Sequence, residues 1–388
     1  MNLPPPANAS PAPRERAGLW EIAAVFLKLG TIAFGGPAAH IALMEAEFVS
    51  RRGWLSRQEF LDRLGAANLI PGPNSTEMAI FIGQSRAGWP GLIVAGTCFI
   101  IPASIIVAAI AAAYVRYGVL PQVSGVLYGV KAVVIAIIAH AFWKLAQSAV
   151  KSRYLALIGV VSAALAFLAV NNLLILAIAA LMAALPKLRR KHQMTIPILF
   201  TPALVPIAGL SAPAGFSLLR LFLVFLKTGA VLFGSGYVLL AFLRADFVVR
   251  LHWLTEKQLL DAVAVGQVTP GPVFTTATFS GYLLAGVPGA ALATIAIFLP
   301  GFLLVAASGP LISKMRRSPL TGAAFDGVVV ASLALMGVVA WQLGKSALVD
   351  WTTLVMALAS LLLLLTSRVN AMWLILGAGM VGLLRSFQ

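Results

Sequence analysis

The chain has 388 residues, of which 60% are hydrophobic and only 10% are charged, and its mean hydropathy is +0.96. A globular protein carries about 25% charged residues, so this composition excludes a soluble domain. The formal net charge of +16 does not indicate nucleic-acid binding, because the basic residues gather in short loops such as KLRRK at 187–191 and KMRR at 314–317. Loops of this kind set the orientation of membrane proteins. The sequence predicts an all-α polytopic membrane protein.

Apolar stretches long enough to cross about 30 Å of hydrocarbon recur along the chain. Residues 1–19 are rich in proline and alanine and are predicted to be a disordered tail. We then expect a first repeat at 20–186, a basic loop and linker span at 187–216, and a second repeat at 217–385. About 13 spans are predicted, at 20–45, 64–84, 89–114, 124–144, 154–170, 172–186, 195–210, 217–244, 262–283, 287–308, 325–343, 351–366 and 369–385.

The chain contains a duplication. Residues 26–73 align without a gap on residues 225–272, and both segments end in Pro-Gly-Pro, at 71–73 and 270–272. The match resumes after a one-residue deletion, with pairs such as Gly83/Gly281 and Gly129/Gly327. Apolar halves that are broken by glycine and proline at corresponding places are typical of secondary transporters.

When the linker span is included, an odd number of crossings separates the start of the first repeat from the start of the second. The two repeats would then run through the membrane in opposite directions, which is an inverted-topology repeat. One loop disagrees with this count. Four arginines would face the outside against the positive-inside rule, unless acidic neighbours offset them or 64–84 is a re-entrant element. They are Arg51, Arg52, Arg57 and Arg63.

The Pro-Gly-Pro motifs predict broken helices. Proline removes an amide donor and clashes with the preceding turn, and in lipid such breaks persist only where they face protein or a wet cavity. We expect a half-helix to begin near Pro73 and another near Pro272, with their first amides pointing into the protein. Two such termini near the midplane would form an anion site. The alternative is a plain kink. The expected site residues here are Pro71, Gly72, Pro73, Pro270, Gly271 and Pro272.

Polar residues follow each motif: Asn74, Ser75 and Thr76 in the first half, and Thr275 and Thr276 in the second. Their hydroxyl and amide groups suit an oxyanion. Glu77 has no acidic counterpart in the second half, and an intramembrane carboxylate is a functional hypothesis, here proton binding. The alternative for Glu77 is a structural ion pair with Lys28 or Arg86.

Lys28 and Lys227 occupy equivalent places in apolar segments and are expected to contact the anion, unless they lie near a membrane face and extend to water. Each precedes a glycine break, which adds Gly35, Gly36, Gly234 and Ser235 to the expected site. His40, which is Leu239 in the second half, is a candidate proton relay or a satisfied interior histidine. Gly125 and Gly129 have a small-residue spacing that serves either a homodimer contact or internal packing.

Enzyme motifs are scarce. The four histidines are scattered without metal-ligand spacing, the single Cys98 precludes an intramolecular disulfide, and no phosphate-binding loop of an ATPase occurs. We therefore expect no catalytic residues, no metal and no cofactor.

FGGP-x-x-H from Phe34 to His40, the following E-F-V-x-R-R-x-W-L, the Pro-Gly-Pro and the glycine-rich spans together resemble the chromate ion transporter family. The duplicated length is similar to that of its long-chain, two-domain members. The second half departs from the pattern, with FGSGYVLL in place of FGGPAAHI. The resemblance implies a multi-pass exporter of chromate in the bacterial inner membrane, driven by the membrane gradient. A proton-coupled transporter of sulfate or another oxyanion remains the alternative, and a membrane-embedded enzyme is disfavoured.

Overall fold

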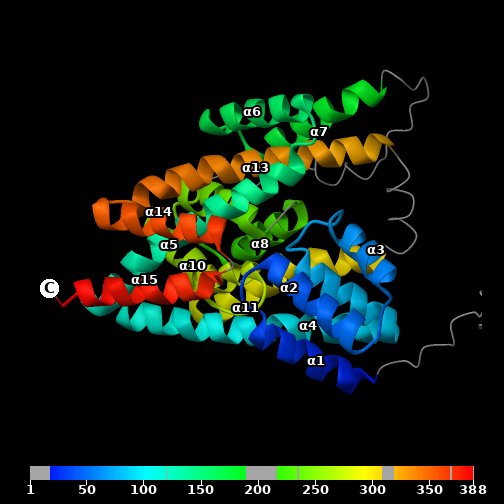
Figure 1. Ribbon diagram of the computed structural model, residues 1–388, viewed down its shortest axis with the longest axis horizontal. Coiled ribbons are helices and arrows are strands. Elements are labelled where there is room, and N and C mark those ends of the chain that lie inside the picture. The colour runs from blue at the N-terminus through cyan, green and yellow to red at the C-terminus, as the bar shows by residue number, and fades with distance from the viewer. Residues whose placement is uncertain are drawn as a thin grey trace, which may run out of the picture.

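The computed structural model describes residues 18–118, 120–188, 216–233, 236–307, 319–367 and 369–387, and every regular element within these ranges is helical (Figure 1). Most of the tail at 1–19 and the expected linker span at 195–210 lie outside the described residues. Four segments are long and apolar enough to cross a membrane: Ser75–Tyr117, Pro121–Ala149, Val273–Ala307 and Pro319–Ala347. Four shorter apolar helices also occur among the described residues. The chain is therefore a helical membrane protein, and the number of about 13 spans stays a prediction.

The same series of elements occurs twice. The first half comprises α1 (Leu19–Ile32), α2 (Pro37–Glu45), the π-helix η1 (Ala46–Arg51), α3 (Arg57–Ala67), α4 (Ser75–Tyr117), α5 (Pro121–Ala149), α6 (Arg153–Phe167) and α7 (Asn172–Leu188). The second comprises α8 (Leu218–Val231), η5 (Gly236–Val238), α9 (Leu239–Leu243), the π-helix η6 (Arg244–Arg250), α10 (Glu256–Val268), η7 (Val273–Thr275), α11 (Thr276–Ala307), α13 (Pro319–Ala347), α14 (Trp351–Thr366) and α15 (Ala371–Arg385).

Matching caps begin α3 and α10. Ser56 accepts a hydrogen bond from the backbone of Glu59, whose side chain accepts one from the backbone of Ser56. Thr255 and Gln258 form the same reciprocal pair at the start of α10. These capping boxes satisfy backbone donors that a helix start leaves unpaired. The equivalent positions of the two repeats therefore fold alike locally.

The expected span at 20–45 is instead two helices that fold back on each other. Arg52, after η1, pairs with Glu21 at the start of α1 at 2.5 Å, and the rings of Phe26 and Phe48 stack at 5.1 Å. The start of α1 and the end of η1 therefore lie at the same end of the molecule. The second half repeats this arrangement, with Phe225 against Phe247 at 4.9 Å. Of the four arginines that seemed misplaced, Arg51 ends this folded-back pair, Arg52 follows it, and Arg57 and Arg63 lie on α3.

A tight hairpin lies within α4. Ala87 and Gly88 leave helical geometry, and Gly83 packs against Gly91 and Ala95. Residues eight apart in a straight helix would be about 12 Å apart, so this contact requires the chain to reverse. The hairpin has a short arm, 75–86, and a long arm, 89–117. These two arms stand where the sequence predicted separate spans at 64–84 and 89–114. In α11 the same reversal occurs at Ala285 and Gly286.

The two halves exchange helices. α5 of the first half packs against α14 and α15 of the second, and α13 of the second packs against α6 and α7 of the first. Equivalent helices α5 and α13 lie antiparallel, because Ile135 meets Gly344, Phe142 meets Gly337 and Lys151 pairs with Asp326. Figure 1 shows α13 between α6 and α5, and α15 beside α5. Neither half is an independent bundle.

Gly125 and Gly129 belong to this exchange. A side chain at Gly125 would meet the backbone of Gly382 on α15, and one at Gly129 would meet the backbone of Ala378. The small-residue spacing therefore serves internal packing between the halves. The expected homodimer gains no support from it.

Candidate functional site

The helix breaks of the two halves meet and bond across the halves. The backbone N–H of Gly72, in the first Pro-Gly-Pro, donates to the carbonyl of Leu232 at the break after α8. Reciprocally, the N–H of Gly271 donates to the carbonyl of Ala33 at the break after α1. The two distances are 2.8 and 2.9 Å. Because a break in an apolar span leaves backbone groups that water cannot reach, this reciprocal pairing is what makes four breaks tolerable together.

The two Pro-Gly-Pro motifs are buried at this point, including Pro71, Pro73, Pro270 and Pro272. Gly72 has a φ of 147° and Gly271 a φ of 85°, a range that side chains rarely adopt. The first half-helix begins at Ser75, and the second begins with η7 at Val273. Each Pro-Gly-Pro thus lies between the end of one helix and the start of the next, and these starts are close to the predicted Pro73 and Pro272.

His40 ties three of the breaks together. Its Nε2 lies 3.0 Å from the carbonyl oxygen of Ala33, and its Nδ1 lies 3.2 Å from Oγ of Ser75 at the start of the half-helix. A carbonyl can only accept, so Nε2 carries a hydrogen and donates. Ala33 therefore accepts from both His40 and Gly271. His40 is 1% exposed, and its position is that of an interior bridging group.

Glu77 is a buried carboxyl beside the first Pro-Gly-Pro. It is 1% exposed, and its Oε2 has no hydrogen-bond partner. The carboxyl group lies against Gly72 and against Gly301 of α11, where a Cβ would lie 2.7 Å from Oε1. No ion pair of Glu77 occurs within the described residues; Arg86 instead lies 5.4 Å from the ring of Trp54. The expected alternative of an ion pair with Lys28 or Arg86 is not formed.

The hydroxyl groups of the two half-helix starts differ. In the second half, Oγ1 of Thr275 donates to Pro272 and Oγ1 of Thr276 donates to Val273, so both hydrogens are already used. In the first half, Oγ1 of Thr76 is buried without a partner. Among these threonine hydroxyls, the one that has no partner within the described residues is therefore that of Thr76. Asn74, which precedes this helix with a φ of 60°, makes no side-chain cap.

The two lysines lie elsewhere. Lys28 is exposed on α1. Lys227 is mostly buried, but its Nζ lies 2.5 Å from Oδ2 of Asp246, which also pairs with Arg250. Neither lysine therefore reaches the buried site in this conformation. Lys28 fits the alternative of a lysine that extends to the surface. Lys227 is neutralised by Asp246, a carboxylate that the alignment did not single out. Gly36 is buried and Gly35 exposed at the first break, whereas Gly234 and Ser235 lie outside the described residues.

The sequence reasoning missed one buried charged cluster. Nζ of Lys131 on α5 lies 2.8 Å from Oδ1 of Asp261 on α10, and the hydroxyl of Tyr114 on α4 donates to Oδ2 of Asp261 at 2.8 Å. Lys131 is 12% exposed at its side chain and Asp261 is 0% exposed. Lys131 stands in an apolar span, which was a signal in the sequence. Its neighbours come from both halves.

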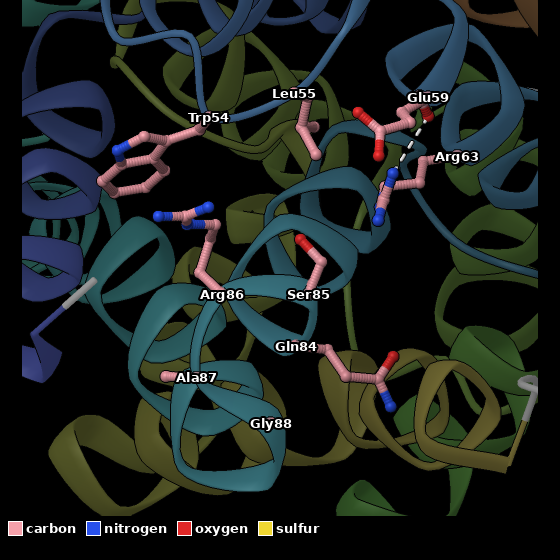
Figure 2. Close-up of a pocket in the computed structure, with 9 residues that line it drawn as sticks. All are labelled: Trp54, Leu55, Glu59, Arg63, Gln84, Ser85, Arg86, Ala87 and Gly88. Atoms are coloured by element: carbon pink, nitrogen blue, oxygen red, sulfur yellow. Dashed lines mark hydrogen bonds between the residues drawn. The ribbon is translucent and has the colours of Figure 1, made fainter. Parts of the chain in front are cut away.

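A pocket of about 510 Å³ lies at the tip of the first hairpin (Figure 2). Figure 2 shows the guanidinium groups of Arg63 and Arg86 on either side of the Ser85 hydroxyl, with the ring of Trp54 beside Arg86. Glu59 lines the same space, and its backbone carbonyl accepts a hydrogen bond from Arg63. The pocket joins the start of α3 to the reversal at Ala87 and Gly88 and is polar.

A family model described as chromate transporter matches residues 20–184 and again residues 219–383. The chain belongs to the chromate transporter family. It is 34% identical, over 99% of its length and 98% of the relative's, to the chromate transport protein of Cupriavidus metallidurans. It is 36% identical, over 89% of both chains, to the probable chromate transport protein of Synechococcus elongatus. No solved structure matches the chain. Membership makes the chain a membrane transporter rather than an enzyme.

Proposed function

We propose that the chain is a secondary active transporter that exports chromate across the bacterial inner membrane. The substrate class follows from the family and from the names of relatives that span the full length of the chain. The observation that supports the mechanism is the reciprocal pair of bonds that joins the Pro-Gly-Pro before each half-helix to the helix break of the other half, Gly72 to Leu232 and Gly271 to Ala33. Helix N-termini favour anions through their unpaired amides.

We further propose an inverted-topology repeat. The antiparallel contacts between the equivalent helices α5 and α13 support it, and so do those between α4 and α11, where Gly96 packs against Phe302. A twofold axis in the membrane plane would turn each half over relative to the other, and the substrate would bind near that axis. The anion would lie between the starts of the short arms of α4 and α11, at the midplane.

Membrane potential supplies the driving force in this proposal. Moving one charge through 100 mV contributes about 2.3 kcal/mol, so export of a dianion from a negative-inside cell gains roughly twice that amount. Glu77 is the proposed site of proton coupling, because it is a buried carboxyl that forms no ion pair among the described residues and whose Oε2 has no hydrogen-bond partner. An isolated buried carboxylate is costly to keep charged, and the arrival of an anion nearby raises that cost further.

The alternative is a proton-coupled transporter of sulfate or a similar oxyanion. The central groups are backbone amides and hydroxyls, which recognise charge and tetrahedral shape. Chromate and sulfate share both properties, so this site alone does not separate them, and competition decides between the two.

The test is flux of radiolabelled chromate into everted membrane vesicles, with and without excess sulfate and with an uncoupler. We expect accumulation that collapses with the uncoupler, and sulfate inhibition if both ions use one site. Vesicles from cells with the empty vector are the control. Equal uptake in the control vesicles, or uptake that the uncoupler leaves unchanged, would contradict gradient-driven chromate export.

A further inference from the structure

The two halves differ at one pair of equivalent places, the tips of their hairpins. At the first tip, Arg63, Ser85 and Arg86 line the open polar pocket. The aligned residues in the second half are Ala262, Leu283 and Leu284. Ala262 is fully buried, and it packs in an apolar cluster with Val107, Ala111, Val265 and Phe279, against which Tyr114 and Leu283 also pack. The space beside Arg63 is therefore an open polar pocket, whereas the equivalent place beside Ala262 is filled by apolar side chains, although Leu283 and Leu284 at the second tip are partly exposed.

The buried charged cluster lies at this filled place. Asp261 directly precedes Ala262 on α10, and Tyr114 packs against the apolar cluster with its ring 5.3 Å from that of Phe279. Asp261 holds Lys131 of α5 and Tyr114 of α4, which belong to the first half, against α10 of the second. The contact thus joins the two halves across the place that, by the repeat, corresponds to the open pocket.

The first half does not repeat this cluster. The equivalent of Lys131 is Val329, and the equivalent of Asp261 is the exposed Asp62. α10 packs against α5, whereas its counterpart α3 packs mainly against α4, so the ion pair belongs to a contact that the second half makes and the first half leaves open. A buried ion pair gains little net stability over apolar packing, because both ions lose their hydration. Breaking it by removing one partner is nevertheless strongly unfavourable. Such a contact suits a latch that holds one of two conformations.

We propose that Lys131, Asp261 and Tyr114 form the gate that closes the transport path at the second hairpin tip, while the pocket at Arg63 and Arg86 is open at the first. In the other conformation the cluster separates, the second tip opens, and Lys131 becomes the cation that an oxyanion meets there. The identity of that anion rests on the proposed function. The gate itself does not, because it is a statement about which tip water reaches.

The test measures the rate at which a water-soluble maleimide labels single cysteines in purified protein in detergent. Cys98→Ala removes the native thiol. Ser85→Cys reports the open tip and Ala262→Cys the closed one. We expect fast labelling at residue 85 and slow labelling at residue 262. Adding Lys131→Ala or Asp261→Asn should raise the rate at residue 262 at least about tenfold, since loss of one partner of a buried pair shifts a two-state equilibrium by more than that.

Lys227→Ala is the matched control, because Lys227–Asp246 is a pair of similar burial that lies within one half. It should leave the rate at residue 262 unchanged. The double variant Lys131→Asp with Asp261→Lys exchanges the two charges and should restore slow labelling of residue 262. A variant that had merely unfolded would stay fast. Three results would each overturn the gate. Residue 262 could be labelled fast in the parent, its labelling rate could stay unchanged in both single variants, or Lys227→Ala could raise that rate by the same factor. None of these readings depends on chromate, so the flux experiment fails or succeeds separately.

Discussion

At the scale of single residues, Glu77 and Gly301 form a pair that the two halves do not share. Gly301 leaves the space that the Glu77 carboxyl occupies. By the alignment, the residue equivalent to Gly301 is Ala103, and the second half places Thr275 or Thr276 where Glu77 stands. Ala103 packs beside Gly271. The carboxyl group and the missing side chain therefore compensate for each other.

Gly301→Ala should accordingly lower the thermal unfolding midpoint of the purified protein, because overpacking in a core costs typically about 1–3 kcal/mol. In a Glu77→Thr background, Gly301→Ala should lower the unfolding midpoint much less, since the shorter side chain at residue 77 removes the clash. Gly322→Ala, on the exposed side of α13 where a Cβ meets nothing, is the control and should be neutral or slightly stabilising. Equal losses from Gly301→Ala in both backgrounds would show that the pair is not coupled.

Glu77 could be singled out from the sequence because a carboxylate in an apolar stretch is conspicuous. Gly301 could not, since one glycine among many carries no sign of which side chain it faces. Lys28 and Lys227 misled for a related reason: equivalence in the repeat gave their place along a helix but not the direction in which each side chain points. Lys131 carried the same apolar-span signal as Glu77, yet its partner Asp261 is remote in sequence and appears only in the fold.

At the scale of elements, the helical hairpins depend on small residues at the crossing. A side chain at Gly83 would overlap the backbone carbonyl of Gly91, and backbone cannot move aside as a flexible side chain can. Gly281 and Gly289 meet in the same way in the second half. Thr278 and Thr294 add a hydroxyl hydrogen bond of 2.7 Å across the second hairpin.

Gly83→Ala should therefore destabilise the protein more than Gly88→Ala. Gly88 has a φ of 63° and a ψ of −144°, a conformation that is essentially restricted to glycine, but it has open space around it, so alanine there costs about 1–3 kcal/mol of backbone strain and meets no steric overlap. Thermal unfolding of the two variants, with chromate flux measured alongside, gives the comparison. If Gly88→Ala proved the more damaging, the turn rather than the crossing would determine the hairpin.

The Pro-Gly-Pro breaks could be read from the sequence because proline and glycine act locally. The folding back of α1 and α8 against the helices that follow them could not be read from the sequence. Hydropathy reports that a segment such as 20–45 is apolar, and a helix that enters and returns is as apolar as one that crosses. The direction of the chain after Gly36 is determined by contacts such as Phe26 with Phe48, which composition does not contain.

At the scale of the whole molecule, the exchange of helices makes each half incomplete without the other. Gly327 of α13 fits against Ala179 and Ala183 of α7, as Gly129 of α5 fits against Ala378 of α15. The duplication was plain in the sequence, and so was its suggestion of a pseudo-twofold. The interlocking of the halves could not be seen in the sequence, because an alignment shows which segments are equivalent and does not show which segments are in contact.

The protein can be divided within residues 189–215 and its two halves co-expressed as separate chains. We expect the two chains to form a complex that co-purifies through a tag on either one. The buried contacts of α5 and α13 lie between the two pieces, so the linker is not needed to hold them together. Each piece expressed alone should fail to give a monodisperse peak on size exclusion. Two pieces that behave well alone and do not associate would contradict the interlocked arrangement.

The reciprocal bonds of Gly72 and Gly271 also bear on how the protein is made. Gly72 emerges from the ribosome long before Leu232, whose carbonyl is its acceptor. Until that partner arrives, the nascent first half holds an unpaired amide in a segment bound for lipid, where each such group costs several kcal/mol. This bond therefore forms only after translation has delivered the second half, and the amide of Gly72 needs another partner until then.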